Sequence, residues 1–347
     1  MFFASDNAGP VHPAIMEKLA TANAGYALPY GNDPLMDEVR EKIRDIFEAP
    51  EAAVYLVATG TAANSLALAT LTQPFETIFC SPLAHIHEDE CNAPEFYTGG
   101  AKLTLVPGGD KMTAESLRET IAGEQTRGVH GPQRGPVSIT QITERGGVYS
   151  LSEIQDLAEV AQSFGVPVHL DGARFANALV ALNCSPAEMT WKAGVDAVSF
   201  GGTKNGCMGV EAVILFNQDK AWEFELRRKR GAQLFSKHRY LSAQMAAYLT
   251  DDLWLSLARK SNDACASLRE KLVAAGVEIA WGGTANMIFP RFSRAAHQRL
   301  HEAGALYNMW DGELQGANPE EMLTARLVCD WSASDENTDR FIEILNG

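Results

Sequence analysis

A strand passes directly into a helix in the stretch VYLVATGTAANSLALA, residues 54–69. The first four residues are β-branched, aromatic or aliphatic and favour a strand, whereas residues 62–69 are rich in alanine and leucine, which favour a helix. Between them, Thr59-Gly60-Thr61 would direct backbone N–H groups and a hydroxyl at an anion on the helix N-terminus. This junction therefore predicts a phosphate site or, alternatively, an ordinary helix start.

The same alternation of short apolar runs and helical stretches continues along the chain. It predicts an α/β fold around a mostly parallel sheet. Further strands are expected at residues 137–142, 166–170, 197–200 and 210–216, and a helix at 151–164.

After about residue 220, the alternation of short strands and helices gives way to longer helical stretches. A basic run, residues 227–230, leads into long amphipathic helices that extend to about residue 275. Strands then follow at 277–280, 286–289 and 325–329. We therefore expect a large domain over residues 1–245, which includes the N-terminal segment, and a smaller α+β domain over residues 246–347.

Composition excludes several classes of function. The 347 residues include 29 basic and 44 acidic side chains, for a net charge of −15, so phosphate backbones and anionic lipid surfaces are not attracted in general. Local arginines can still bind an anionic small molecule. The chain begins without a signal-peptide pattern and has no apolar run of membrane-spanning length, so we expect a soluble, cytoplasmic protein. The six cysteines form no CxxC pair and are expected to be buried, reduced thiols.

Lys204 is the first residue that points to chemistry. It follows the strand expected at 197–200 and lies among small residues, Gly201-Gly202-Thr203-Lys204-Asn205-Gly206. Ligands of open α/β sheets bind beyond the carboxyl ends of the strands. A lysine shielded from water there loses its proton and attacks a carbonyl carbon to form a Schiff base. Taken alone, the segment also fits a solvated loop lysine.

Asp171 strengthens this interpretation. It ends the apolar strand of His169-Leu170-Asp171-Gly172-Ala173-Arg174, so its carboxylate would face the same crevice as Lys204. An acid in that place keeps the pyridine nitrogen of pyridoxal 5'-phosphate (PLP) protonated, which makes the ring an electron sink. Asp171 could also cap the next helix, and the two roles are compatible.

Six segments then match a known family in their order along the chain. The chain resembles the low-specificity L-threonine aldolases, which are PLP-dependent, aspartate-aminotransferase-like enzymes of fold type I. The resemblance extends from residue 5 to the region of Arg326. The segments are Ser5-Asp6-Asn7, Tyr30-Gly31-Asn32-Asp33, Thr59-Gly60-Thr61, Ala84-His85-Ile86, His169-Leu170-Asp171-Gly172-Ala173-Arg174 and Ser199-Phe200-Gly201-Gly202-Thr203-Lys204.

The resemblance implies a role for each matched residue. Lys204 would bind PLP covalently, and Asp171 would pair with the pyridine nitrogen. Gly60 and Thr61 would bind the phosphate. His85 would stack on the cofactor ring, near the β-hydroxyl of the substrate; its alternative is a partly exposed loop histidine.

The resemblance also implies a clamp for the substrate carboxylate, made by Ser5, Arg174 and Arg326. The bidentate fork of a guanidinium suits this task. Arg174 is also expected among the residues around the cofactor. As alternatives, Arg174 would be a partner in a structural ion pair and Arg326 a surface arginine.

Two points stay open in the comparison with the family. Some members carry a histidine where this chain has Glu144, so the base for the β-hydroxyl is His85, Glu144 or water. Arg228 or Lys229 lies where the family lends a basic side chain to a neighbouring subunit, although a solvated helix face explains this run equally well. The resemblance implies a dimer or tetramer with shared active sites.

The expected activity is the cleavage of L-threonine, L-allo-threonine or a related β-hydroxy-α-amino acid to glycine and an aldehyde. A phenylserine-type aldolase, a β-eliminating lyase or an aminotransferase would use the same PLP residues, and a non-catalytic ligand-binding protein is a further alternative. His297 and His301 share a helix face, but they lack the glutamate of an HExxH motif and a third ligand. We therefore expect a surface helix there and no metal site.

Overall fold

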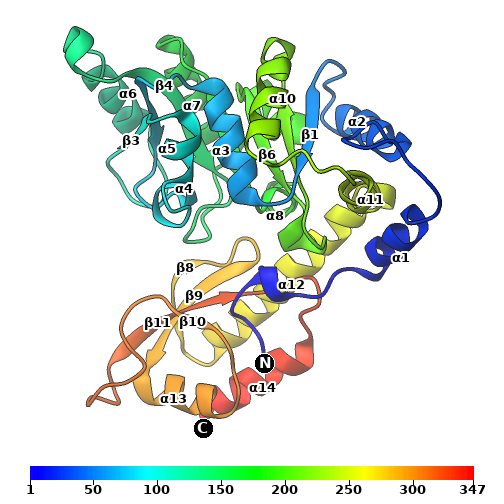
Figure 1. Cartoon of the computed structure of the whole chain (residues 1–347). Coiled ribbons are helices and arrows are strands. Elements are labelled where there is room, and N and C mark those ends of the chain that lie inside the picture. The colour runs from blue at the N-terminus through cyan, green and yellow to red at the C-terminus, as the bar shows by residue number, and fades with distance from the viewer.

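A seven-stranded sheet forms the centre of the computed structural model, which describes residues 1–347 (Figure 1). The strand order is β1-β7-β6-β5-β4-β2-β3. Only β7 runs antiparallel to its neighbours β6 and β1, and every other pair is parallel. This confirms the expected α/β fold with a mostly parallel sheet. The strands are β1 Ala53–Val57, β2 Glu76–Cys80, β3 Lys102–Leu105, β4 Gln133–Thr140, β5 Val168–Gly172, β6 Ala197–Gly201 and β7 Glu211–Leu215.

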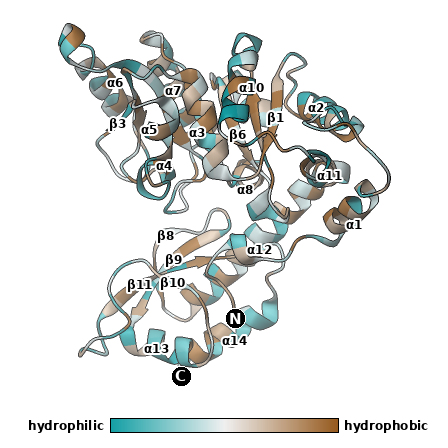
Figure 2. Ribbon diagram, in the orientation of Figure 1, coloured by the Kyte–Doolittle hydropathy of each residue, from teal (hydrophilic) through white to brown (hydrophobic).

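Both faces of this sheet are buried under helices. In β1, Ala53, Tyr55 and Val57 belong to one hydrophobic core, whereas Val54 and Leu56 belong to another, because successive side chains of a strand point to opposite faces. Strands buried on both faces are continuous apolar runs in the sequence. Figure 2 shows this hydrophobic character along β1 and β6, between the helices.

Helix α3, Gly60–Leu71, lies against the first of these faces together with α5, Ala93–Thr98, and α10, Ala221–Arg230. It begins where Thr59 Oγ1 accepts a hydrogen bond from the Ala62 N–H, at 3.2 Å. Every residue from Ala62 to Thr70 is buried, as expected for a helix that is apolar nearly all round. The remaining helices of the large layer are α1 Pro13–Ala22, α2 Pro34–Ile46, α4 His85–Glu88, α6 Ala114–Gly123, α7 Leu151–Ser163, α8 Phe175–Leu182, α9 Pro186–Met189 and α11 Arg239–Tyr248.

A smaller antiparallel layer completes the molecule. Its four strands have the order β10-β11-β9-β8 and form a second core with the helices beside them. Helix α12, Leu253–Ala274, is 22 residues long and runs between the two layers (Figure 1). The other elements are β8 Glu278–Gly282, β9 Met287–Ser293, α13 Arg294–Glu302, β10 Asn308–Met309, β11 Met322–Val328 and α14 Asp335–Asn346.

The N-terminus lies beside this smaller layer (Figure 1). Phe3 is buried in the second core, and its N–H donates to the carbonyl of Leu306 at 2.8 Å. The division predicted at residue 245 falls inside α11, and it stays a prediction. None of the helices combines the length and the apolar character that a membrane crossing requires.

Two expectations about single residues were wrong. His297 is not on the surface: it is fully buried, with Nδ1 2.9 Å from the Tyr307 hydroxyl and Nε2 3.1 Å from the carbonyl of Leu323. Both ring nitrogens are therefore used inside the protein. All six cysteines are free thiols, but Cys91 is exposed and Cys184 is half-buried rather than buried.

Candidate active site

Lys204 and Asp171 line one cavity of about 250 Å³ at the carboxyl edge of the sheet. Strands β5 and β6 are parallel, with Asp171 opposite Ser199, so their carboxyl ends reach the same edge. Lys204 lies in the turn η4, Thr203–Asn205, directly after β6. The topology thus brings together the amine and the carboxylate that the sequence places on separate strands.

Two glycines let these strand ends approach closely. A Cβ atom on Gly172 would lie 2.7 Å from the carbonyl oxygen of Ser199, and one on Gly201 would collide with the carbonyl of Ala173. Any larger residue would force the two ends apart. Gly172 and Gly201 therefore keep Asp171 and the turn that carries Lys204 beside the same cavity.

The Lys204 amine has neither a hydrogen-bond partner nor an ion-pair partner, although the residue is half-buried. Burial lowers the pKa of Lys204, and the positive charge of Arg174 lowers it further, against the opposing charges of Asp6, Glu144 and Asp171. A lowered pKa increases the fraction of neutral amine, which is the form that attacks a carbonyl carbon.

Asp171 is held by two hydrogen bonds. Its Oδ2 accepts from Asn64 Nδ2 at 2.9 Å, and its Oδ1 accepts from the N–H of Ala173 at 3.1 Å. The second bond closes a local turn and is not a helix cap, because α8 begins at Phe175 with Arg174 as its N-cap and no side-chain cap. The helix-cap alternative for Asp171 is therefore wrong. The first bond directs the carboxylate to the cavity wall.

The N-terminus of α3, where the sequence predicts a phosphate site, forms another wall of the cavity. Thr59, Gly60 and Thr61 line it at the N-terminus of α3, where the first N–H groups of a helix have no partner within the helix. A Cβ on Gly60 would meet no atom within 4 Å, so the space beside it is open. An amine, a buried acid and an anion site around one cavity are the donor set that PLP requires, and the residues therefore fit this cofactor.

His85 lines the cavity as the first residue of α4. Its Nδ1 lies 2.8 Å from Oε1 of Glu90. Burial lowers the pKa of His85, but the hydrogen bond to Glu90 and the charges of Asp171 and Glu144 outweigh it, so the pKa is raised.

The predicted carboxylate clamp contains an ion pair. Arg174 is buried and donates from Nε and Nη2 to the two carboxylate oxygens of Asp6, at 2.7 and 2.9 Å. Asp6 also accepts from Asn286 Nδ2 at 3.1 Å. Arg174 is thus a partner in a buried ion pair, which is the alternative stated for it above.

Arg326 and Ser5 lie nearby with fewer partners. Arg326 is half-buried and donates only to the carbonyl of Ala4, at 3.3 Å. Burial and the positive charge of Arg174 lower the pKa of Arg326. Ser5 Oγ accepts from the N–H of Asn7 at 3.1 Å. Arg326 therefore lies near a second guanidinium, that of Arg174, and has no carboxylate partner itself.

Comparisons with known proteins agree with this geometry. The family model described as Beta-eliminating lyase matches residues 3–305. The low specificity L-threonine aldolase of Pseudomonas aeruginosa is 40% identical to this chain over 337 residues, covering 96% of this chain and 94% of the relative. The chain belongs to the low-specificity L-threonine aldolases of the beta-eliminating lyase family.

Solved structures support the same assignment. The Leishmania major threonine aldolase superposes with a TM-score of 0.91 at 26% identity, over 99% of this chain and 98% of that one. A serine palmitoyltransferase from Sphingomonas wittichii shares the fold, with a TM-score of 0.71 at 14% identity over 100% and 86% of the two chains. The expected family, PLP dependence and fold type I architecture of this threonine aldolase family member are confirmed.

Glu144 does not line the cavity of Lys204 and Asp171 in this family member, but its carboxylate lies close enough to influence the charged groups there. It is half-buried and has no hydrogen-bond partner, while the residues on both sides are tied to Asp110 through the Thr143 hydroxyl and, at 3.2 Å, through the N–H of Arg145. Its charge contributes to the raised pKa of His85 and Arg174, and it opposes the lowering of the Lys204 pKa. Glu144 is therefore held close to the cations of the site.

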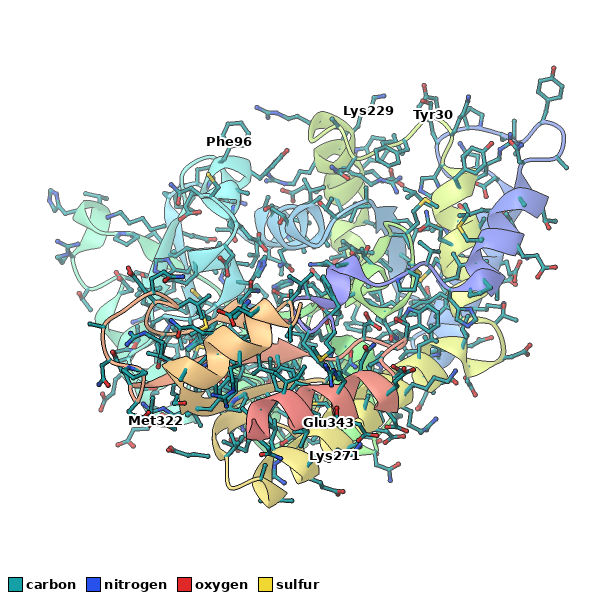
Figure 3. All side chains as sticks on the ribbon, turned by 90° about the horizontal axis from the view of Figure 1, so that it is seen from below. Tyr30, Phe96, Lys229, Lys271, Met322 and Glu343 are labelled. Carbon is teal, nitrogen blue, oxygen red and sulfur yellow. The ribbon has the colours of Figure 1, made fainter.

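Arg228 and Lys229 differ in their surroundings. Arg228 is buried, with its guanidinium over the Tyr55 ring and 3.1 Å from Glu225. Lys229 is exposed, and its ammonium group lies 5.1 Å from the centre of the Tyr30 ring; Figure 3 shows these two side chains beside each other. That either residue reaches a neighbouring site stays a prediction.

Sequence reasoning missed several residues of the cavity wall. Asn64, Glu90, Thr203 and Glu211 line it as well, and Glu211 accepts from the N–H of Gly202 at 2.7 Å. Burial raises the pKa of Glu211 to about 7. Asn64 carried a signal, because it is the one amide side chain in an apolar helix. Glu90 and Glu211 carried none, since an isolated glutamate is common in a sequence.

Proposed function

We propose that this protein is a PLP-dependent aldolase that cleaves L-threonine, L-allo-threonine or a related β-hydroxy-α-amino acid to glycine and an aldehyde. The observation that carries the proposal is the shared cavity of Lys204, Asp171 and the N-terminus of α3. The 40% identity to a low specificity L-threonine aldolase supports the choice of reaction over transamination.

Each of these residues has one task. Lys204 binds the cofactor, Gly60 and Thr61 hold its phosphate with Thr59, and Asp171 holds a proton on its ring nitrogen. When bound, PLP supplies an electron sink for the pair left on Cα after the Cα–Cβ bond breaks.

Two arginines bind the substrate carboxylate. Asp6 already neutralises Arg174, whereas Arg326 donates only to the carbonyl of Ala4 and is free to take an anion. Arg326 therefore makes the main contact, with Ser5 and Arg174 beside it. By fixing the carboxylate, this clamp selects which bond of Cα is aligned for cleavage.

His85 takes the proton from the β-hydroxyl group. It lines the cavity and is partly exposed there, and its second ring nitrogen has no partner in the protein. Glu144 is the second candidate for this base, because its carboxylate has no hydrogen-bond partner and its charge affects the pKa of Lys204 and Arg174. A cytoplasmic dimer or tetramer, with Arg228 or Lys229 serving a neighbouring site, is our expectation from the sequence.

The test is product analysis with threonine, allo-threonine, serine and phenylserine as substrates. We expect equal amounts of glycine and acetaldehyde from threonine, and the order of rates gives the natural substrate class. Ammonia and a keto acid would instead identify a β-eliminating enzyme. Protein that stays colourless when supplied with PLP would instead support the alternative of a non-catalytic ligand-binding protein.

A further inference from the structure

Four polar side chains form a continuous hydrogen-bonded chain along one wall of the cavity. His85 Nδ1 lies 2.8 Å from Glu90 Oε1, and Asn64 Nδ2 donates both to Glu90 Oε1 and to Asp171 Oδ2, at 2.9 Å each. All four residues line the cavity, and three of them, Asn64, Glu90 and Asp171, are buried. The imidazole and the ring-nitrogen carboxylate are thus joined through two residues that have no task in the proposed function.

The pattern of donors indicates which imidazole nitrogen carries the proton. Glu90 Oε1 already accepts a hydrogen bond from Asn64 Nδ2, so the His85 nitrogen that faces the same oxygen is assigned as Nδ1–H. In the neutral imidazole, Nε2 is then unprotonated. Because Nε2 has no partner in the protein, it is available to a group in the cavity.

We propose that Glu90 and Asn64 are positioning residues for carbon–carbon cleavage: Glu90 holds His85 as the Nδ1–H tautomer, and Asn64 ties this pair to Asp171. The β-hydroxyl proton moves to Nε2 of His85, the O–H electron pair forms the C=O bond of the aldehyde, and the Cα–Cβ pair stays on Cα. This inference rests on the proposed function and deepens it.

The charges around His85 act in one direction. Glu90 follows α4, Asp171 belongs to β5 and Glu144 lies after β4, and all three are acidic groups that raise the pKa of the imidazole against the effect of burial. Removing the charge of Glu90 while keeping an oxygen acceptor, as in E90Q, is therefore expected to lower the pKa of His85. The tautomer would still be supported by the amide oxygen of the new glutamine.

A divalent cation is the other occupant that this cluster suggests. Ligand atoms of His85, Glu90 and Asp171 lie within 4.8 Å of one another. However, one nitrogen, Asn64 Nδ2, already donates to both carboxylates. An amide donor holding the two acids together takes the place of the cation, so the observations favour the hydrogen-bonded chain.

The first test needs no cofactor. Histidine titration by NMR in the PLP-free protein, with His85 assigned through H85N, should show a His85 pKa above the usual range and Nδ1–H as the neutral tautomer. E90Q should lower this pKa. The control E95Q changes a half-buried glutamate five residues on, whose Oε2 has no partner, and should leave the pKa unchanged. The same His85 pKa in wild type and E90Q would overturn the proposal.

The second test separates cleavage from proton exchange at Cα. Hydrogen–deuterium exchange at the α-carbon of glycine uses the same PLP site but has no β-hydroxyl group. At neutral pH, E90Q is expected to cleave threonine roughly tenfold to a hundredfold more slowly, with exchange within about threefold of wild type. The acid limb of its kcat profile should move to lower pH, because the imidazole stays neutral to lower pH. An equal loss of both rates without that shift would mean a merely structural role.

Asn64 is tested against its neighbour in α3. N64A removes the donor to both acids, so cleavage and exchange should both fall, whereas S65A removes a buried hydroxyl with no partner and should keep wild-type rates. N64A that behaves like S65A would overturn the link to Asp171. Wild-type protein that releases no aldehyde from any β-hydroxy amino acid would refute the proposed function instead, and the NMR titration would still decide the His85–Glu90 contact.

Discussion

His297, in the antiparallel layer of β8–β11, and Lys204, beside the cavity, are two ionisable residues with different surroundings. In the antiparallel layer, both nitrogens of His297 are hydrogen-bonded, and burial lowers its pKa to about 4. Beside the cavity, the Lys204 amine is unpaired, and buried atoms of Asn64 and Glu90 have no partner. The antiparallel layer also has unpaired buried atoms, at Asn286 Oδ1, Arg291 Nε and His301 Nε2, but beside Lys204 they belong to residues that line one cavity. Buried polar groups are usually satisfied within the protein, so unpaired groups gathered around one cavity mark a place for a ligand.

Replacement of Lys204 by alanine tests whether the unpaired amine beside the cavity is needed for cofactor binding and cleavage, and it should have the largest effect. K204A removes the proposed covalent link, so threonine cleavage should fall to background and the visible absorbance of the bound PLP imine should be lost. Aldehyde release and absorbance spectra measure both effects. The matched control is K192A, an exposed lysine paired with Glu48, which should keep wild-type cleavage. A K204A protein with normal turnover would contradict the assignment.

The ion pair between Asp6 and Arg174 joins the two regions, because Asp6 also accepts from Asn286 beside β9. D6N leaves a buried guanidinium without its carboxylate and should lower the free energy of unfolding by about 3–5 kcal/mol. Urea denaturation at pH 7 measures this loss. A loss below about 1 kcal/mol would mean that the pair contributes little.

The same pair has a defined pH dependence. Burial raises the pKa of Asp6, but the charges of Arg174 and Lys204 outweigh it, so the folded pKa lies below the 3.8 that is usual for an aspartate. The stabilisation is therefore complete above the unfolded pKa and is lost as the pH falls through the folded pKa. Acid unfolding curves should show this pH-dependent loss of stability in the wild-type protein and not in D6N.

Replacement of Arg326 by lysine should affect substrate binding rather than folding. Lysine keeps the charge but loses the planar fork, so one charge-assisted hydrogen bond, about 1.5 kcal/mol, is lost and KM for threonine rises about tenfold. We expect kcat to change less than KM. R340K, at an exposed arginine of α14, is the control. An unchanged KM in R326K would move the clamp to another residue.

Replacement of His297 should have the smallest effect on catalysis. H297Q leaves hydrogen-bond partners in the antiparallel layer imperfectly matched and should cost about 1–3 kcal/mol of stability, with cleavage rates unchanged. Because the folded pKa of about 4 lies below the 6.5 that is usual for a histidine, protonation of His297 in the unfolded chain destabilises the fold as the pH falls from 6.5 to about 4. H297Q should lose that part of the pH dependence. A large fall in kcat would contradict the separation of the two regions.

Much of the site was predictable because its decisive residues stand at the ends of apolar strands. Lys204 after β6, Asp171 on β5 and Thr59 before α3 each follow or end a segment whose apolar character predicts a strand or a junction. In a parallel sheet such ends meet at one edge, so strand order alone brings them together. The surface position predicted for His297 was wrong, since a helix face with two histidines does not reveal what packs against it.

The sequence by itself determined the alternation of strands and helices, the mostly parallel sheet and the pairing of an amine with an acid at its edge. These properties depend on local apolar periodicity and on residue type at strand ends. The tertiary structure alone decided that Asp6 holds Arg174 and that Asn64 joins Glu90 to Asp171. Such contacts link residues far apart in the chain, and a polar side chain selects its partner only when packing has removed water and brought a matching donor within reach.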